Sequence, residues 1–427
     1  MSIDKLYQIF RQYPIVCTDS RNCLPDSLFF ALKGASFDGN LFAAKALEAG
    51  CRYAVVDNPT VKTDERYLLV ENVLQTLQQL AAYHRQLLKP TVIGITGTNG
   101  KTTTKELLAA VLSTKYKLIY TSGNLNNHIG VPLTLLRLTP EHEIAVIEMG
   151  ANHPGEIREL SLIARPNYGI ITNVGLAHLE GFGSFEGVVR TKGELYQFLR
   201  QTNGKVFIHK ENTCLQAIAE GLQQITYGES EDAFVTGRVT DTHPFLCFEW
   251  ASAGMKHTVS THLVGDYNLW NVLAAITVGL HFDIAASEIN RAIHAYIPSN
   301  NRSQLKKTAH NELVIDAYNA NPSSMQAALA NFAKLQHNPK AVILGDMREL
   351  GVESLRLHAE MVEKLHHYGF DKVFLCGEQF AATKSAYPCF PDTETLSRHL
   401  SAYPLQGYYI LIKGSHGIHL ENVIDFL

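Results

Sequence analysis

A glycine-rich turn that carries a lysine and two adjacent threonines lies between an expected strand and an expected helix. The turn is Gly97-Thr-Asn-Gly-Lys-Thr-Thr103; the apolar run Val92–Ile95 precedes it, and the helical pattern of Leu107–Leu112 follows it. Two glycines let backbone N–H groups point at one anion, and a helix N-terminus adds its positive dipole end. The lysine can then reach terminal phosphates, and a threonine hydroxyl can hold Mg²⁺. The turn therefore predicts a phosphate-binding loop.

The loop departs from the common form of this motif at one position. The common form has a glycine five residues before the Gly–Lys pair, where this chain has Ile95. The loop is thus a shorter variant, and the alternative is an ordinary strand-to-helix turn with a solvated lysine. The order of strand, glycines, lysine and hydroxyls favours the phosphate-binding loop.

Length and composition limit the class of protein. The chain has 427 residues, 46% hydrophobic and 18% charged, which is typical of a globular protein of two to four domains. The net charge of −4 and the lack of a basic tract give no support for a nucleic-acid partner. The first residues do not form a signal peptide, and no apolar stretch has the length of a membrane span. The seven scattered cysteines, without a C-x-x-C pair, fit reduced thiols in the cytosol.

Alternating strand and helix patterns predict three α/β domains, which we place at 1–88, 89–298 and 299–427. The first is small and ends near Pro90. The second is expected to hold a parallel sheet with active-site groups at the carboxyl ends of its strands, followed by a strand-rich stretch over 204–264. The third reads as a smaller Rossmann-like unit without Gly-x-Gly-x-x-Gly, in which Ser323 is expected to cap a helix that runs to Leu335.

Two further polar residues follow strands of the expected central sheet. Glu148 ends the run that begins at Ile144, and His178 follows the strand Tyr168–Val174. Both are expected at the same edge of the sheet as the phosphate-binding loop. The alternatives are a salt-bridged glutamate and a packed or capping histidine; similarly, Lys192 can be an ordinary solvated helix lysine.

Several segments of the chain resemble the Mur ligase superfamily, the ATP-dependent amide-bond-forming ligases of cell-wall synthesis. Gly97–Thr102 looks like the phosphate loop of that superfamily, which also accounts for the missing first glycine. Within the superfamily, the resemblance points to the ligase that adds D-alanyl-D-alanine to UDP-N-acetylmuramoyl-tripeptide. The segments that carry this choice are Gly123–Thr134, Glu148–Glu156, Asp316–Pro322 and Leu344–Gly351.

The resemblance implies a reaction in two steps and a set of ligands. ATP phosphorylates the C-terminal carboxylate of the tripeptide, and the amine of D-alanyl-D-alanine then attacks the acyl phosphate. The cofactors would be ATP and Mg²⁺, and the protein would be a cytoplasmic monomer. One domain alone does not supply the nucleotide and UDP contacts, so we expect hinges near Lys89–Pro90 and Pro298–Asn301.

The resemblance also implies roles for individual residues. The catalytic residues would be Lys101, Lys192 and His178. Mg²⁺ would be held by Thr102 (or Thr103), Glu148, His178 and Lys192, the lysine as its carbamate, because an unmodified ammonium would repel the metal. The nucleotide would contact Gly97, Thr98, Asn99, Gly100, Lys101, Thr102, Thr103, Asn268, Arg302 and Asp316. The peptide substrates and UDP would contact Ser20, Arg21, Asn126, Asn127, Tyr318, Asn319 and Asn321.

Some positions and some functions stay open at this point. Asn40 stands where the family commonly has histidine, His416 where it has arginine, and Arg302 follows Asn301 instead of glycine. Asn126 and Asn127 can be turn formers. The alternative functions are a sister ligase that adds the third peptide residue, a ligase like folylpolyglutamate synthase, and a non-catalytic nucleotide-binding module.

Overall fold

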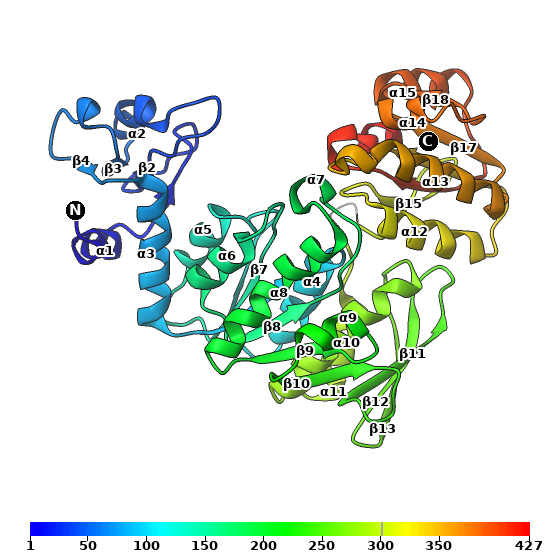
Figure 1. Ribbon diagram of the computed structural model, residues 1–427, viewed down its shortest axis with the longest axis horizontal. Coiled ribbons are helices and arrows are strands. Elements are labelled where there is room, and N and C mark those ends of the chain that lie inside the picture. Colours follow the sequence, from blue (N-terminus) through cyan, green and yellow to red (C-terminus); the bar gives the residue numbers. More distant parts are fainter. Residues whose placement is uncertain (300–301) are drawn as a thin grey trace.

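The chain folds around three β-sheets of four, nine and six strands, each with its own helices (Figure 1). This computed structural model describes residues 1–299 and 302–427. The expected class, three α/β parts with a central parallel-sheet unit, is confirmed. Residues 300 and 301, which belong to the expected hinge Pro298–Asn301, lie outside the described residues.

The N-terminal sheet is small and entirely parallel. Its order is β1 (Val16–Cys17), β2 (Leu28–Phe30), β3 (Tyr53–Val56) and β4 (Tyr67–Leu69). The helices are α1 (Ile3–Gln12), α2 (Ala43–Glu48) and α3 (Val73–Leu88). Helix α3 packs on α1 and also on α5 and α6 of the central part, and it lies between the two parts in Figure 1. The chain then turns at Lys89, in the left-handed region, and Pro90 leads into the central sheet.

The central sheet has nine strands in the order β13-β12-β11-β10-β9-β8-β5-β7-β6. The strands are β5 (Thr91–Thr96), β6 (Leu118–Tyr120), β7 (Ile144–Glu148), β8 (Tyr168–Ile171), β9 (Lys205–His209), β10 (Gln223–Gly228), β11 (Val235–Asp241), β12 (Cys247–Ser252) and β13 (Met255–Ser260). The neighbouring strands between β6 and β11 in this order are parallel to one another. Strand β12 runs antiparallel to both of its neighbours, β11 and β13. The strand-rich stretch over 204–264 thus extends the central sheet, which is mixed at this edge.

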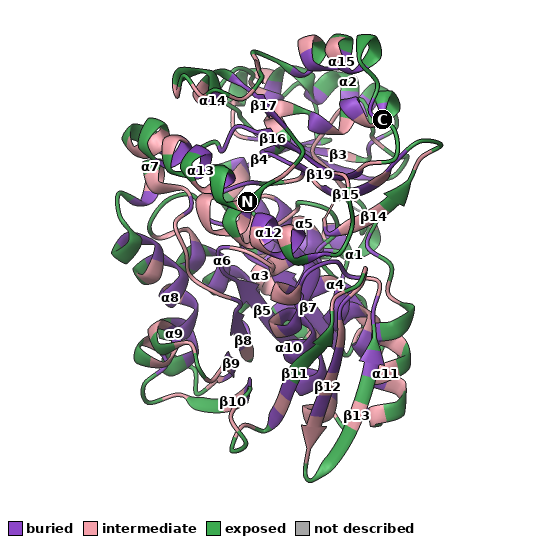
Figure 2. Ribbon diagram, turned by 90° about the vertical axis from the view of Figure 1, so that its right-hand side faces the viewer, coloured by how far each residue is buried: buried purple, intermediate pink, exposed green. Residues whose placement is uncertain are grey.

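Two layers of helices cover the central sheet because its strands are apolar on both faces. Ile93 and Ile95 of β5 pack with α4 (Lys101–Leu112), α10 (Leu269–His281) and α11 (Ala286–Ala295). Val92 faces the opposite layer, which includes α5 (Gly130–Leu135), α6 (Glu156–Ala164) and α8 (Phe185–Gln201). Figure 2 shows the buried residues concentrated on these central strands. The short helices α7 (Leu179–Phe182) and α9 (Thr213–Ile218) complete this part.

The C-terminal sheet has the order β14-β15-β19-β16-β17-β18, with β14 antiparallel and the others parallel. Its strands are β14 (Gln304–Lys307), β15 (Glu312–Asp316), β16 (Lys340–Gly345), β17 (Lys372–Cys376), β18 (Cys389–Phe390) and β19 (Tyr409–Lys413). Its helices are α12 (Pro322–Lys334), α13 (Ser354–Tyr368), α14 (Glu378–Ala382) and α15 (Thr393–Ala402). The prediction that Ser323 caps α12 is wrong: Asn321 is the N-cap, because Pro322 occupies the first helical position.

Short 3₁₀ turns connect several of these elements. They are Gly39–Phe42, Pro59–Val61, Asp266–Asn268, Gly351–Glu353, His416–Ile418 and Leu420–Phe426. Across residues 1–299 and 302–427, we find no helix with the length and apolar character that crossing a membrane requires.

Candidate active site

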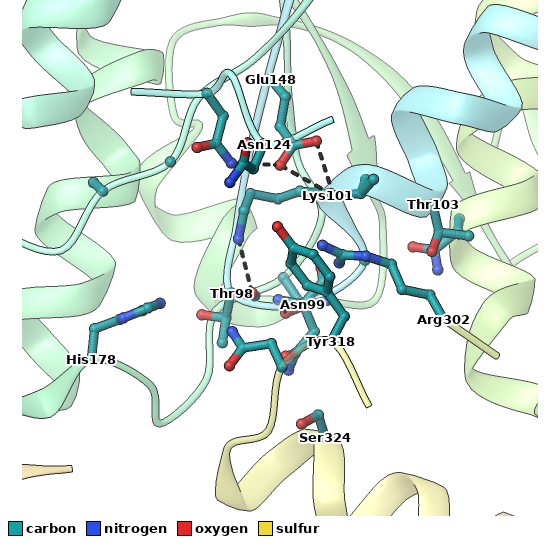
Figure 3. Close-up of a pocket in the computed structure, with 18 of the residues that line it drawn as sticks. Thr98, Asn99, Lys101, Thr103, Asn124, Glu148, His178, Arg302, Tyr318 and Ser324 are labelled. Atoms are coloured by element: carbon teal, nitrogen blue, oxygen red, sulfur yellow. Dashed lines mark hydrogen bonds between the residues drawn. The ribbon is translucent and has the colours of Figure 1, made fainter. Parts of the chain in front are cut away.

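A cleft of about 700 Å³ lies where the carboxyl ends of the central strands face β15 and α12 of the C-terminal part (Figure 3). Most residues predicted for the site line this cleft: Thr98, Asn99, Gly100, Lys101, Thr102, Thr103, Asn126, Asn127, Glu148, His178, Asn268, Arg302, Asp316, Tyr318 and Asn319. Five predicted residues do not line it: Ser20, Arg21, Gly97, Lys192 and Asn321. The structure therefore brings most of the residues predicted for the nucleotide, from two sheets, to one cleft.

The phosphate-binding loop is built on the end of β5 and the start of α4. Gly97 has φ 139° and Gly100 has φ 78°, conformations that L side chains rarely adopt. A Cβ on Gly97 would also lie 2.1 Å from the Thr172 hydroxyl oxygen, so glycine is required for close packing against β8. The loop ends where Lys101 begins α4, as the sequence predicts for an anion site at a helix N-terminus.

Lys101 lies folded back on its own loop. Its Nζ donates hydrogen bonds to the carbonyl oxygens of Gly97 at 2.7 Å and of Thr98 at 3.0 Å. Burial lowers the pKa of Lys101 to about 8, an effect that the nearby Glu148 carboxylate opposes and Arg302 reinforces. The ammonium thus has partners that a bound phosphate would replace.

Glu148 is buried at the end of β7 and faces the loop. Its carboxylate accepts hydrogen bonds from the Thr102 hydroxyl at 3.0 and 3.2 Å and from the Asn126 amide at 2.8 Å. A carboxylate beside a hydroxyl is an oxygen donor set of the kind that Mg²⁺ prefers.

Sequence reasoning missed Lys105, a fully buried α4 residue whose Nζ lies 2.9 Å from Glu106 and 3.9 Å from Glu148.

His178 and Lys192 are not gathered around Glu148 in this structure. His178 is the residue just before α7 and pairs through Nδ1 with the Glu349 carboxylate of the C-terminal part. Figure 3 shows it apart from Glu148. Lys192 is buried in α8, where its Nζ donates to the Ala151 carbonyl oxygen at 3.3 Å. Burial, with a smaller contribution from Lys101, lowers the pKa of Lys192 well below its ordinary value. Among the described residues, no group of three His, Cys, Asp or Glu side chains forms a metal site.

Asn268 and Asp316, predicted for the nucleotide base and ribose, lie at the ends of the 3₁₀ turn Asp266–Asn268 and of β15. Asn268 is buried and donates to the Val264 carbonyl oxygen at 2.9 Å. Asp316 forms an ion pair with Lys413, a buried residue that sequence reasoning missed. The Lys413 Nζ also donates to the Asn319 carbonyl oxygen at 3.2 Å.

An aromatic stack borders the same side of the cleft. The Arg302 guanidinium lies 3.8 Å from the Tyr318 ring centroid, and the His416 ring stacks on Tyr318 with centroids 5.5 Å apart. Stacking on an aromatic ring holds the guanidinium plane in place and leaves its N–H donors free for a phosphate or a base. His416, which departs from the family pattern, thus contributes a planar side chain to this stack.

Several asparagines have structural partners. Asn127 accepts hydrogen bonds from the backbone N–H groups of Ile129 and Gly130, as expected for a turn former. Asn321 caps α12. Asn40 is buried and fixes a turn, because its amide donates to Asp38 and Asp57 while its carbonyl oxygen accepts from the Asp57 N–H.

Ser20 and Arg21 lie on the loop after β1, within the N-terminal sheet. Arg21 is exposed and makes a two-pronged contact with the Asp19 carboxylate at 2.8 and 2.9 Å. This sheet lies at the opposite end of the molecule from the C-terminal sheet in Figure 1. The structure therefore separates the predicted UDP contacts from the cleft.

Three family models together cover most of the chain. They are the Mur ligase family catalytic domain over 12–85, the Mur ligase middle domain over 95–279 and the Mur ligase glutamate ligase domain over 301–416. Two relatives named UDP-N-acetylmuramoyl-tripeptide–D-alanyl-D-alanine ligase, from Bacillus subtilis and Escherichia coli, are each 35% identical. The alignments cover 96% of this chain and 92% and 93% of the relatives.

Solved structures give the same result. MurF from Acinetobacter baumannii superposes with a TM-score of 0.88 at 30% identity over 96% of this chain and 92% of that one. MurF ligase from Thermotoga maritima, solved in complex with ADP, has a TM-score of 0.87 at 27% identity over 96% of both chains. The three family models, the relatives and these structures agree: the chain belongs to the Mur ligase family.

Proposed function

We propose that this protein joins D-alanyl-D-alanine to UDP-N-acetylmuramoyl-tripeptide in peptidoglycan precursor synthesis, with conversion of ATP to ADP and phosphate. Relatives that carry this ligase name match nearly the whole chain at 35% identity. The structural observation that carries the proposal is the cleft in which Lys101 and Glu148 face Asp316 and Arg302. Such a cleft offers cations and oxygen ligands to a triphosphate from two sides.

The first step transfers a phosphoryl group. An oxygen of the tripeptide carboxylate attacks the γ-phosphorus of ATP, the bond to the ADP oxygen breaks, and an acyl phosphate forms. The loop N–H groups hold the phosphates, and the Lys101 ammonium leaves the carbonyl oxygens of Gly97 and Thr98 to bind the transferring group. The Arg302 guanidinium approaches from the C-terminal side of the cleft.

The second step forms the amide bond. The amine nitrogen of D-alanyl-D-alanine attacks the acyl carbon, the carbon–oxygen bond to phosphate breaks, and the nitrogen loses a proton. We place this dipeptide near Tyr318, Asn319 and Asn321, and the muramoyl peptide near Asn126 and Asn127. These groups lie beside the loop, so the carboxylate and the amine can meet where the acyl phosphate forms.

Thr102 and Glu148 fit a magnesium ion because they offer a hydroxyl and a carboxylate oxygen at the phosphate-binding loop. Bound there, Mg²⁺ would neutralise phosphate charge and orient the γ-phosphate. A second ion would be held by Glu148, His178 and a carbamylated Lys192, which this structure does not gather around one point. Carbamylation joins the neutral amine nitrogen to the carbon of CO₂ with loss of a proton, and the lowered pKa of Lys192 supplies that neutral amine. To hold that ion, the His178 ring would have to release the Glu349 carboxylate with which its Nδ1 pairs.

The wider organisation follows the same proposal. We assign 1–88 to the UDP end, with Ser20 and Arg21 as contacts, 89–298 to ATP and 299–427 to completion of the ATP and dipeptide sites. We place the protein in the cytoplasm as a monomer. Likeness to the ligase that adds diaminopimelate, at 17% identity, and to folylpolyglutamate synthase, at 12%, concerns the fold alone.

One assay tests the proposed function against the alternatives. ADP release from ATP and Mg²⁺ is measured with UDP-N-acetylmuramoyl-tripeptide, with and without D-alanyl-D-alanine. The proposal expects release that depends on both substrates and a product longer by the dipeptide. ADP release that instead requires UDP-N-acetylmuramoyl-dipeptide and a single amino acid would indicate a sister ligase and overturn the proposal. ADP release that requires pteroylglutamate and glutamate would overturn it as well. Nucleotide binding without any release would indicate a binding module.

A further inference from the structure

Three polar side chains form a closed ring between the phosphate-binding loop and helix α12. The Asn321 side-chain amide donates to the Asn99 side-chain oxygen at 2.8 Å, and the Asn99 side-chain amide donates to the Ser323 hydroxyl oxygen at 3.1 Å. The Ser323 hydroxyl in turn donates to the Asn321 side-chain oxygen at 2.8 Å. Each group thus donates once and accepts once, an arrangement in which hydrogen bonds strengthen one another.

The loop side of this ring is held by the central sheet through backbone contacts. The Asn99 backbone N–H donates to the Asn173 side-chain oxygen at 3.0 Å, and the Asn173 side-chain amide and the Thr172 hydroxyl both donate to the Asn99 backbone carbonyl oxygen. The backbone of Asn99 is therefore fixed without its side chain. The side chain is left to contact residues that lie more than two hundred positions away in the chain.

The other side of the ring is a helix cap. The Asn321 side-chain oxygen accepts from the Ser324 N–H at 2.9 Å, and the Asn321 N–H donates to the Ser324 hydroxyl oxygen at 3.1 Å. Serine, threonine and aspartate also make good caps, but their side chains lack an amide N–H₂ group. Asparagine caps α12 with its oxygen and has its amide free to reach Asn99.

We propose that Asn99, Asn321 and Ser323 are positioning residues that fix the C-terminal part against the phosphate-binding loop. The ring places β15 and α12 so that Asp316 and Arg302 border the same cleft as Lys101. In this role Asn321 acts through Asn99 and does not need to touch a substrate. This inference rests on the proposed nucleotide role of the loop, but it is independent of which peptide is ligated.

The test is a double-mutant cycle on purified full-length protein. Asn321→Ser keeps a capping hydroxyl but is too short to reach Asn99, and Asn99→Ala removes the loop side of the ring. Loss of neutral hydrogen bonds is expected to weaken ADP binding and to lower kcat/KM for ATP about three- to tenfold in each variant. The loss in the double variant should be smaller than the sum of the two single losses, because both substitutions break the same ring.

A matched control separates positioning from helix capping. Asn212 caps α9, away from the cleft, by accepting from the Leu215 N–H at 3.1 Å. Asn321→Ser should lower the melting temperature at least as much as Asn212→Ser, because it changes a cap and also breaks the ring. Only Asn321→Ser should speed hydrogen exchange of the amides over 97–104 in nucleotide-free protein. If Asn321→Ser does not fold, Ser323→Ala breaks the ring while it keeps the Asn321 cap.

Two results would overturn the proposal. One is additive losses of ADP affinity in the double variant, and the other is unchanged exchange of the loop amides in Asn321→Ser. ADP affinity and exchange do not depend on the peptide substrates. A coupled ring in a protein that does not ligate D-alanyl-D-alanine would therefore refute the proposed function and support the positioning role.

Discussion

The ion pair between Asp316 and Lys413 permits a quantitative prediction. The two residues end the neighbouring strands β15 and β19; the Lys413 side chain is 2% exposed and that of Asp316 is 17% exposed. Asp316→Asn removes the negative charge at constant size and leaves a buried ammonium with the Asn319 carbonyl oxygen as an acceptor. Removing one partner of a buried pair costs about 3–5 kcal/mol. We expect about 3 kcal/mol of lost unfolding free energy, because Asp316 borders the water-accessible cleft.

A second variant separates this stability effect from the proposed ribose contact. Asp316→Asn combined with Lys413→Met removes both charges, so its unfolding free energy should return to within about 1 kcal/mol of the unmodified protein. Nucleotide affinity should stay low in both variants, because neither has the Asp316 carboxylate.

Stability is measured by urea unfolding, and each transition is fitted separately because a chain of this size need not unfold in one step. ADP affinity is measured by calorimetry. If Asp316→Asn alone were as stable as the unmodified protein, the claim that the Asp316–Lys413 pair stabilises the fold would be refuted. Recovery of ADP affinity in the double variant would refute the nucleotide role of Asp316.

Further predictions concern the two lysines and the hinges. Lys101→Ala should lower kcat by about a hundredfold or more in a folded protein, because the transferring phosphoryl group loses its cation; near-normal turnover would exclude the phosphate loop. Since the pKa of Lys101 is lowered to about 8, its ammonium is present below pH 8 and lost above it. kcat/KM for ATP should therefore be level below pH 8 and fall about tenfold per pH unit above it; a level profile to pH 9.5 contradicts this. Lys192→Ala should be inactive and partly rescued by a small added carboxylate; an unmodified, solvent-facing Lys192 in a nucleotide-bound structure would contradict the carbamate. Solution scattering should show the C-terminal part moving when ATP and the peptide bind, and identical profiles with and without ligands would indicate a preformed site.

Local sequence patterns predicted the central elements well. The apolar run between Pro90 and Gly97 defines β5, and its burial on both faces needs no knowledge of distant residues. Helix α1 was missed because its buried side chains, Leu6, Tyr7 and Phe10, become core only through contact with α3, which lies some seventy positions further on. The three-residue strand β4 was missed because so short a run carries no period.

Site residues that belong to one local sequence motif were predictable. Contacts between residues that lie far apart in the sequence were not. The phosphate-binding loop and Glu148 at a strand end are local patterns. The pairing of Asp316 with Lys413 joins residues 97 positions apart, and His178 pairs with Glu349 of another sheet. The cap of α12 was wrongly predicted at Ser323 because Asn-Pro-Ser-Ser offers several capping residues; the proline at the first helical position is the signal that identifies Asn321 as the cap.

The contacts that close the cleft have a strength that suits a reaction with a water-sensitive intermediate. Three neutral hydrogen bonds at about 1 kcal/mol each give the Asn99–Asn321–Ser323 ring about 3 kcal/mol. Moving an equilibrium from 1:99 to 99:1 takes about 5.5 kcal/mol. The ring therefore biases the two sheets toward closure without locking them, and the bound nucleotide and peptide supply the rest. In the proposed reaction, the acyl phosphate would then form in a closed cleft that excludes water, and release of ADP and phosphate would let the cleft reopen for the product.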